Sequence, residues 1–149
     1  EVHFIQGDTN NVEREVHRYE DLLRQTEIDV ACIGIGENGH IAFNDPEVAD
    51  FHESQLVKVV ELDERSRLQQ YKEGWFTSLE EVPNSAISLT IPAIMRSQAI
   101  SCVVPEKRKA DAVYRTLNGP IDTECPATIL RQHDNAVLFL DNESASKIS

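Results

Sequence analysis

Short apolar runs alternate with amphipathic stretches along the chain, and this alternation restricts the possible folds more than any other feature. The runs Ile28–Ile33, Ala99–Val104 and Ala136–Leu140 have the length and composition of buried strands. Apolar residues recur at helical spacing from Asn10 to Gln25 and from Pro105 to Leu117. No tight hairpin turn separates two apolar runs. The pattern therefore predicts an α/β sandwich with a largely parallel sheet.

Further elements complete this alternation. We expect strands and helical segments at Gln55–Leu62, Asp63–Gly74, Ala86–Thr90, Ile91–Met95 and Pro126–Leu130. Ligands of parallel α/β sheets bind at the carboxyl ends of the strands. The loops after Ile33, Thr90 and Val104 are therefore where a site is expected.

Length and charge narrow the class of protein. The 149 residues fit one domain, and 26 acidic against 14 basic side chains give a net charge of −12. So acidic a chain is a poor candidate for binding nucleic acid or an anionic membrane. No apolar run approaches the roughly 20 residues that span a bilayer, and the first residues do not resemble a signal peptide. Because the chain does not start with Met, we expect a piece of a longer protein.

The three cysteines, Cys32, Cys102 and Cys125, are far apart and odd in number. This distribution is unlike a disulfide framework or a zinc ribbon. It fits small core residues in a reducing compartment, so we expect a cytoplasmic protein. No two histidines have metal-ligand spacing, and no metal is predicted.

A glycine-rich stretch follows the first buried strand. Gly34, Gly36 and Gly39 match the G-x-G-x-x-G pattern of dinucleotide-binding loops. That fingerprint needs a long helix that begins inside the motif, and Pro46 leaves too little room for one. The glycines instead predict close approach of the backbone to another small ligand, and no cofactor is expected.

His40 and Asp45 are the first candidates for chemistry. A carboxylate five residues after a histidine, across a tight loop, can fix the imidazole tautomer and stabilise its protonated form. Glu37 and Asn38 flank the same turn and could add a base or a hydrogen bond. The alternative, that His40 only satisfies local backbone groups, stays open at this point.

Lys107, Arg108 and Lys109 form a basic cluster in the first turn of an expected helix. Cations are unfavourable at a helix N-terminus, so their presence is easier to understand if an anion such as phosphate binds there. The alternative is an ordinary solvated face. Arg65 and Arg67, at the start of another helix, admit the same two interpretations.

The stretch IDVACIGIGENGHIAFNDP, residues 28–46, closely resembles the signature of the glucosamine-6-phosphate deaminase/isomerase family, which is related to the 6-phosphogluconolactonases. The resemblance continues through residues 82–94 and 126–133. It covers nearly the whole chain, residues 1–149 as a single α/β domain, but only the C-terminal portion of the family's usual length. The family's upstream half, with its first strands, phosphate loop and acidic catalytic base, has no counterpart here.

The resemblance implies a Rossmann-like three-layer sandwich, part of a larger family domain. It also implies conversion of glucosamine 6-phosphate to fructose 6-phosphate and ammonia. His40 matches the histidine that promotes opening of the sugar ring, Asp45 its carboxylate partner, which is usually Glu, and Lys107 the lysine that grips the phosphate. Further substrate-binding residues are expected at Gly36, Gly39 and Asn44.

Two positions depart from the family pattern. Asn38 stands where the motif usually has an Asp, and Asn can hydrogen-bond but holds no charge. Glu37 is the residue nearby that could compensate. The family's phosphate-binding arginine falls near Gln70, and Arg67, one turn earlier, is the candidate substitute.

Two alternatives to the amino-sugar phosphate enzyme stay open. One is a 6-phosphogluconolactonase-like hydrolase in which His40 activates water. The other is a sugar-phosphate sensor without catalysis, which Asn38 favours. In each case the expected partner is a small sugar phosphate, and the resemblance allows a homo-oligomer. Because the acidic base lies upstream in the family, we expect the 149 residues alone to be inactive.

Overall fold

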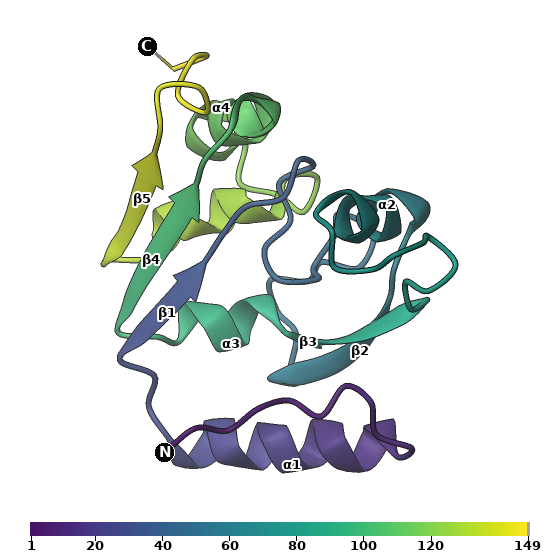
Figure 1. Ribbon diagram of the computed structural model, residues 1–149. Helices are drawn as coiled ribbons and strands as arrows, with labels where there is room; N and C mark the ends of the chain where they lie inside the picture. The colour runs from purple at the N-terminus through teal and green to yellow at the C-terminus, as the bar shows by residue number, and fades with distance from the viewer. Residues whose placement is uncertain (149) are drawn as a thin grey trace.

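A computed structural model describes residues 1–148 of the chain (Figure 1). Within these residues no helix has both the length and the apolar character needed to cross a membrane. The elements are α1 (Val12–Gln25), β1 (Val30–Ile33), β2 (Val57–Glu61), α2 (Glu64–Lys72), β3 (Ser85–Leu89), α3 (Ile91–Met95), β4 (Ala99–Val104), a 3₁₀ turn η1 (Lys107–Lys109), α4 (Ala110–Asn118), a second 3₁₀ segment η2 (Pro126–Gln132) and β5 (Ala136–Leu140).

The three most apolar runs form one parallel sheet in the order β1-β4-β5. Val30 pairs with Ala99, and Ile100 pairs with Ala136, so all three carboxyl ends lie at the same edge (Figure 1). The sequence prediction of an α/β fold with a parallel sheet is confirmed. This edge carries the loop that follows β1 and the turn that follows β4.

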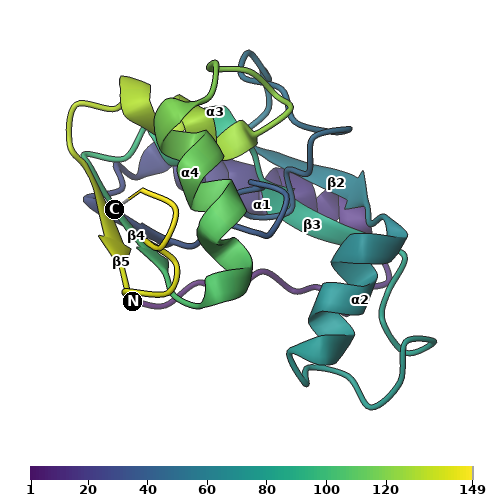
Figure 2. The same ribbon diagram turned by 90° about the horizontal axis from the view of Figure 1, so that it is seen from above.

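One face of this sheet packs on helices and holds the main core. Ile100, Cys102 and Val104 of β4 point into this core and are each 1% exposed, as is Ile91 of α3. Seen from above, α3, α4 and η2 lie along this side (Figure 2). The opposite face is exposed within residues 1–148 rather than covered by a third layer, and its apolar side chains are about half accessible: Val30, Val103, Val137 and Phe139.

The strands β2 and β3 depart from the prediction of one largely parallel sheet. They form a separate antiparallel pair, in which Val57 lies opposite Leu89 and Glu61 opposite Ser85. The connection between them contains α2 and a long loop, so the sequence shows no tight turn that would signal a hairpin. Strand alternation alone could not distinguish this pairing from a parallel one.

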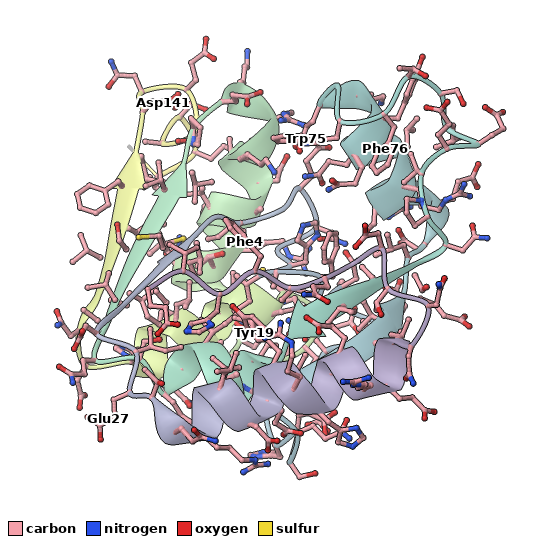
Figure 3. All side chains as sticks on the ribbon, turned by 60° about the horizontal axis from the view of Figure 1, so that its bottom comes forward. Phe4, Tyr19, Glu27, Trp75, Phe76 and Asp141 are labelled. Carbon is pink, nitrogen blue, oxygen red and sulfur yellow. The ribbon has the colours of Figure 1, made fainter. Side chains whose placement is uncertain are left out.

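The helix α1 packs under the antiparallel pair. Val16 of α1 shares a second, smaller core with Leu56 and Val57. The buried carboxylate of Glu20 accepts the Leu56 amide at 2.8 Å. The N-terminal segment runs back along the helix, where the Tyr19 hydroxyl donates to the His3 carbonyl (Figure 3).

The helix after β4 begins later than the sequence suggested. Pro105 is not its first residue; Glu106 follows with a φ of 79°, and η1 precedes α4, which starts at Ala110. The left-handed conformation at Glu106 changes the direction of the chain between β4 and the helix. This change rotates the basic cluster relative to the predicted helix.

Candidate active site

The glycine stretch forms a tight loop at the carboxyl end of β1. The Gly36 amide donates to the His40 carbonyl at 2.9 Å, and the Gly39 amide donates to the Gly36 carbonyl at 3.0 Å. A Cβ at Gly36 would lie 2.1–2.3 Å from atoms of the His40 ring. Only glycine at this position lets the imidazole rest on the backbone.

Gly39 closes the back of the same loop. It has a φ of +91°, and a Cβ there would lie 2.4 Å from the sulfur of the buried Cys125. Its carbonyl accepts the Ala127 amide of η2 at 2.8 Å. Gly39 is therefore needed for the turn and for packing, and it lines neither of the two cavities that His40 borders.

His40, Asp45 and Asn38 form a connected polar group. His40 Nδ1 lies 2.9 Å from Asp45 Oδ1 and 2.8 Å from Asn38 Oδ1. Asn38 Nδ2 donates to Asp45 Oδ1 at 2.7 Å, and Asn38 Oδ1 accepts the His40 amide at 3.0 Å. Because both oxygens near Nδ1 are acceptors, Nδ1 carries a hydrogen, and Nε2 is left to exchange protons.

Asp45 is 4% exposed, and its second oxygen is also bound. Ser66 of α2 donates its hydroxyl to Asp45 Oδ2 at 2.6 Å. Burial would raise the pKa of Asp45, but hydrogen bonds from His40, Asn38 and Ser66 outweigh it and lower the pKa to about 2. The carboxylate is therefore ionised beside the imidazole throughout the neutral range.

A cavity of about 440 Å³ opens in front of His40, between the glycine loop and α2. Asn38 lines it from the loop, and Arg115 borders it from α4. The α2 wall contributes residues at helical i, i+4, i+7 spacing, which place two cations and an amide on one face: Arg65, Gln69 and Lys72. With Arg115, three cations thus face one carboxylate, Glu37, in the lining of this cavity, an excess of positive charge that suits an anionic ligand.

His40 also borders a second cavity, of about 240 Å³. Gly36 and the ammonium-bearing Lys109 line it. Lys109 is 7% exposed; burial lowers its pKa and the neighbouring Arg108 adds to this, while nearby carboxylates oppose it. A buried lysine beside the imidazole is a ready partner for a phosphate group.

The two lysines of the basic cluster lie in different surroundings. Lys107 is exposed and lines neither cavity, whereas Lys109 lines the smaller one. The 3₁₀ turn has three residues per turn, so Lys107 and Lys109 point in different directions. Lys109 lies three and four residues before Ala112 and Val113, which are on the buried face of α4. This i, i+3, i+4 spacing is the sequence signal that the Lys109 side chain points inward.

Two other predicted substrate-binding residues make contacts within the protein and line neither cavity. The Arg67 guanidinium donates to the carbonyls of Leu79 and Val82, at 2.9 and 3.0 Å, and lines neither cavity. Asn44 is fully buried and donates to the carbonyls of Ile41 and Leu89. Both side chains hold loops in place instead of facing a ligand.

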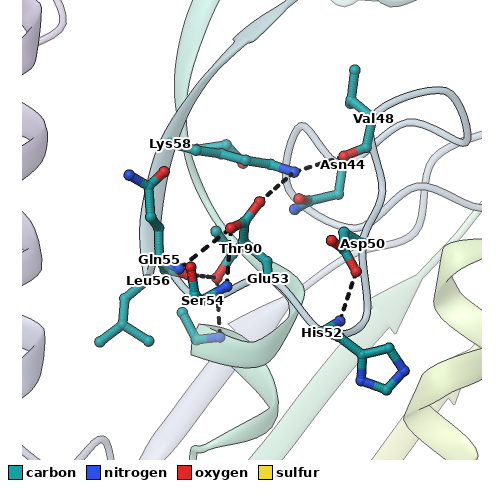
Figure 4. A network of polar contacts seen from close by, with 12 residues as sticks. Asn44, Val48, Asp50, His52, Glu53, Ser54, Gln55, Leu56, Lys58 and Thr90 are labelled. Carbon is teal, nitrogen blue, oxygen red and sulfur yellow. Dashed lines mark hydrogen bonds and ion pairs between the residues drawn. The ribbon is translucent and has the colours of Figure 1, made fainter.

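Asn44 begins a connection that is anchored on β2. The Lys58 ammonium donates to the Val48 carbonyl at 2.6 Å and lies 3.9 Å from Glu53 (Figure 4). Thr90, whose loop was expected at the site, donates instead to the Gln55 carbonyl and caps α3. Thr90 directly follows β3 and α3 begins at the next residue, so no loop separates these two elements.

Glu37 lines the larger cavity, but its carboxylate is paired. Arg108 Nη1 lies 3.0 Å from Glu37, and the same guanidinium lies 2.8 Å from Glu106 and 3.3 Å from Glu73. These ion pairs join the glycine loop, η1 and the end of α2. Glu37 therefore contacts Arg108 and not the His40–Asp45 pair.

Arg65 and Lys109 stood out in the sequence only as members of basic groups that could bind an anion. Ser66, Gln69, Lys72 and Arg115, which line the larger cavity, did not stand out at all. Only their helical phase marks them, since none stands in a recognisable motif. Across residues 1–148 no cluster of three or more histidine, cysteine or carboxylate side chains could hold a metal ion.

Known proteins resemble this chain in sequence and in fold. Residues 1–139 match the family model of glucosamine-6-phosphate isomerases/6-phosphogluconolactonase. The chain is 40% identical over 143 residues to glucosamine-6-phosphate deaminase of Exiguobacterium sibiricum, covering 96% of the chain and 55% of that protein. It is 37% identical to the Streptococcus pyogenes deaminase, covering 95% of the chain and 58% of that protein. The chain thus spans a little over half the length of these relatives.

Solved structures show the same relationship. A monomeric glucosamine-6-phosphate deaminase superposes with a TM-score of 0.87 at 34% identity, covering 94% of this chain and 56% of that one. The 6-phosphogluconolactonase of Trypanosoma brucei shares the fold, with a TM-score of 0.68 at 18% identity. The superposition covers 92% of this chain and 54% of the lactonase chain. The chain therefore belongs to the family of glucosamine-6-phosphate isomerases and 6-phosphogluconolactonases.

Proposed function

We propose that this site serves the conversion of glucosamine 6-phosphate to fructose 6-phosphate and ammonia. The observation that carries the proposal is the His40 imidazole, held at Nδ1 by Asp45 and Asn38 and bordering two cavities with cationic walls. The relatives at 35–40% identity are named for this deamination, whereas the lactonase structures resemble the chain in fold alone.

His40 supplies proton transfer to the sugar ring in this proposal. Opening a cyclic sugar requires a proton to be delivered to the ring oxygen and another to be taken from the anomeric hydroxyl. Nε2 has no hydrogen-bond partner among residues 1–148, so it is available for both transfers. The buried Asp45 carboxylate stabilises the imidazolium that forms between them.

Lys109 holds the phosphate in this proposal. Its ammonium lines the cavity that also borders His40 and Gly36. A phosphate bound there gains a charge-assisted hydrogen bond. Arg65 and Lys72 on the α2 wall add positive charge that favours the approach of an anionic substrate.

Asn38 replaces the carboxylate that the family motif usually carries. Its amide oxygen contacts Nδ1, and its amide nitrogen donates to Asp45. The residue thus keeps a hydrogen-bonded link between His40 and Asp45 without a second charge. The His40–Asp45 pair is thus kept intact, as the proposed catalysis requires.

The proton at carbon 2 must be moved by a base, and no carboxylate of residues 1–148 is placed for this role. Asp45 is buried beneath His40, and Glu37 is paired with Arg108. We therefore propose that the 149 residues bind the sugar phosphate but do not turn it over alone.

The test compares the natural gene product with the 149-residue chain. Each is incubated with glucosamine 6-phosphate and with 6-phosphogluconolactone, while ammonia, fructose 6-phosphate and acid release are measured. We expect ammonia and fructose 6-phosphate from the gene product, loss of both in His40→Asn, and calorimetric binding without turnover by the chain. Lactone hydrolysis without ammonia, or binding without any turnover by the gene product, would overturn the proposal.

Location and partners follow the same proposal. The cysteines Cys32, Cys102 and Cys125 are all free thiols, which supports a cytoplasmic location. The substrate is the one partner proposed; the acidic charge argues against nucleic acid and anionic membranes. Self-association is testable by sedimentation, because the apolar outer face of the sheet, with Phe139 and Val103 about half exposed, favours it.

A further inference from the structure

Ser66 joins the α2 wall of the larger cavity to the carboxylate beneath His40. Its hydroxyl donates to Asp45 Oδ2 at 2.6 Å, across 21 positions of sequence. Within residues 1–148 this is the single hydrogen bond between α2 and the loop that carries His40 and Asp45. Ser66 is 4% exposed and also lines the cavity.

The Asp45 carboxylate is fixed in its plane by donors on both oxygens. Oδ1 is bound by His40 and Asn38, and Oδ2 by Ser66. Without the Ser66 donor, only the contacts of His40 and Asn38 with Oδ1 would oppose rotation about the last side-chain bond of Asp45. The alignment of Oδ1 with the imidazole therefore depends on what holds Oδ2.

Ser66 is itself held rigidly at the start of α2. Asp63 caps the helix, and its side chain accepts the Ser66 amide at 2.6 Å. The cap fixes the backbone of Ser66 in the first turn of α2, and from there its hydroxyl bonds to Asp45. On the same helix, Arg65 and Gln69 line the cavity.

We propose that Ser66 is a positioning residue: it holds Asp45 in the orientation that aligns His40, and it ties the position of the α2 wall to the His40–Asp45 pair. The proposal rests on the proposed function for what His40 does, but the geometry stands without it. A helix that shifts on ligand binding would move the Ser66 donor and so alter the basicity of the pair.

Other charged groups line the two cavities that His40 borders, and the Asp63 carboxylate of the α2 cap accepts the Ser66 amide. Glu37 comes from the glycine loop, Arg65 and Lys72 from α2, Arg115 from α4 and Lys109 from η1. None of them is in hydrogen-bond contact with Asp45 within the described residues, unlike Ser66. These charged groups are present in every variant compared below. A difference between variants in the pKa of Asp45 therefore reports on the Ser66 hydroxyl.

The test titrates the Asp45 carboxyl carbon by NMR in the 149-residue chain. In the unsubstituted chain we expect Asp45 to stay ionised from pH 6 to pH 3, since its pKa is about 2. In Ser66→Ala the loss of a charge-assisted hydrogen bond raises that pKa by about one to two pH units, into the observable range. Ser66→Thr keeps a hydroxyl and is expected to resemble the unsubstituted chain.

Ser97→Ala is the matched control, because the Ser97 hydroxyl is equally buried and has no hydrogen-bond partner among residues 1–148. We expect no change in the titration of Asp45 in that variant. If Ser66→Ala does not fold, Ser66→Cys is used instead, since a thiol is a weaker donor of similar shape. We then expect a smaller rise in the pKa of Asp45. An unchanged titration in the folded alanine or cysteine variant, or an equal shift in Ser97→Ala, would overturn the proposal.

A second arm separates this proposal from the proposed function. In the natural gene product, Ser66→Ala is expected to lower kcat for ammonia release about tenfold or more with a smaller change in KM, and Ser66→Thr to restore it. A shifted titration in a protein that releases no ammonia leaves the positioning role standing and removes the proposed function. Ammonia release with an unshifted titration of Asp45 leaves the proposed function standing and removes the positioning role of Ser66.

Discussion

The imidazole of His40 lies on the α-carbon of Gly36, where a Cβ would come within 2.1–2.3 Å of the ring. The backbone between them closes a turn, because the Gly36 amide donates to the His40 carbonyl at 2.9 Å. The side of the ring that faces Gly36 is thus in contact with backbone, and Nδ1 is bound by Asp45. The imidazole is held by its surroundings before any ligand arrives.

Gly36→Ala tests this contact. The methyl group cannot share space with the ring, so His40 must turn away from Asp45. We expect kcat/KM for the gene product to fall about a hundredfold, with a loss of stability of about 1–3 kcal/mol. Gly7→Ala is the control, because a Cβ at Gly7 meets nothing within 4 Å. Equal activity of the two variants would show that the ring does not need this position.

The fold and the centre of the site were predictable from the sequence because both depend on local patterns. Apolar runs identified β1, β4 and β5, and the short span from His40 to Asp45 crosses a single loop. Such contacts follow from the geometry of one turn. The antiparallel pairing of β2 with β3 was not predictable, because the strands are joined through α2 and lack a turn signal.

The rest of the site depends on helical phase and on contacts far apart in sequence. Lys109, and not Lys107, lines a cavity because a left-handed residue, Glu106, delays the helix and a 3₁₀ turn resets its phase. Ser66 reaches Asp45 only once α2 is folded beside the glycine loop. Neither event leaves a motif in the sequence.

Lys109→Met and Lys107→Met form a matched pair that tests the phosphate site. Removing the buried ammonium is expected to weaken binding of glucosamine 6-phosphate about 10- to 100-fold, the usual effect of losing one charge-assisted hydrogen bond. The exposed Lys107 lines neither cavity and should change binding less than twofold. Calorimetric titration of each variant measures the difference. A larger loss in the Lys107 variant would restore the original prediction.

The pair of Asp45 with His40 predicts a particular acid dependence of stability. The folded pKa of Asp45, about 2, lies below its ordinary value of 3.8, so the stabilisation is present above about pH 4 and is lost as pH falls towards 2. Its size is about 2 kcal/mol. Urea unfolding of the chain and of Asp45→Asn between pH 6 and pH 3 should therefore give curves that converge on acidification. A constant difference at every pH would contradict the assignment.

Arg108 predicts a salt-sensitive connection across the mouth of the site. Its guanidinium meets Glu37 at 3.0 Å and Glu73 at 3.3 Å, and it is one-third exposed. Exposed pairs contribute little, about 0.5 kcal/mol each, so Arg108→Ala should barely change global stability. It should speed amide hydrogen exchange in α2 and in residues 73–82 several-fold, and added salt should do the same in the unsubstituted chain. Lys107→Ala, next to it in η1, is the control and should leave exchange unchanged.

Asn38→Asp tests whether one carboxylate or two suits this site. In the present chain Asn38 Nδ2 donates to Asp45 Oδ1 at 2.7 Å. An aspartate would replace that donor with a second negative oxygen, so the two carboxylates would hold a proton more tightly than either alone. At pH 8 we expect Asn38→Asp to be less stable by about 1–3 kcal/mol. Because the paired carboxyls then bind a proton more tightly in the folded state, the loss of stability should shrink as pH falls towards 5.

Asn38→Ala is the control. It removes the same hydrogen bonds without adding charge, so its loss of stability should not change with pH over this range. Urea unfolding at pH 8 and pH 5 measures both variants, and an equal pH response in the two would show that charge at position 38 does not act on Asp45.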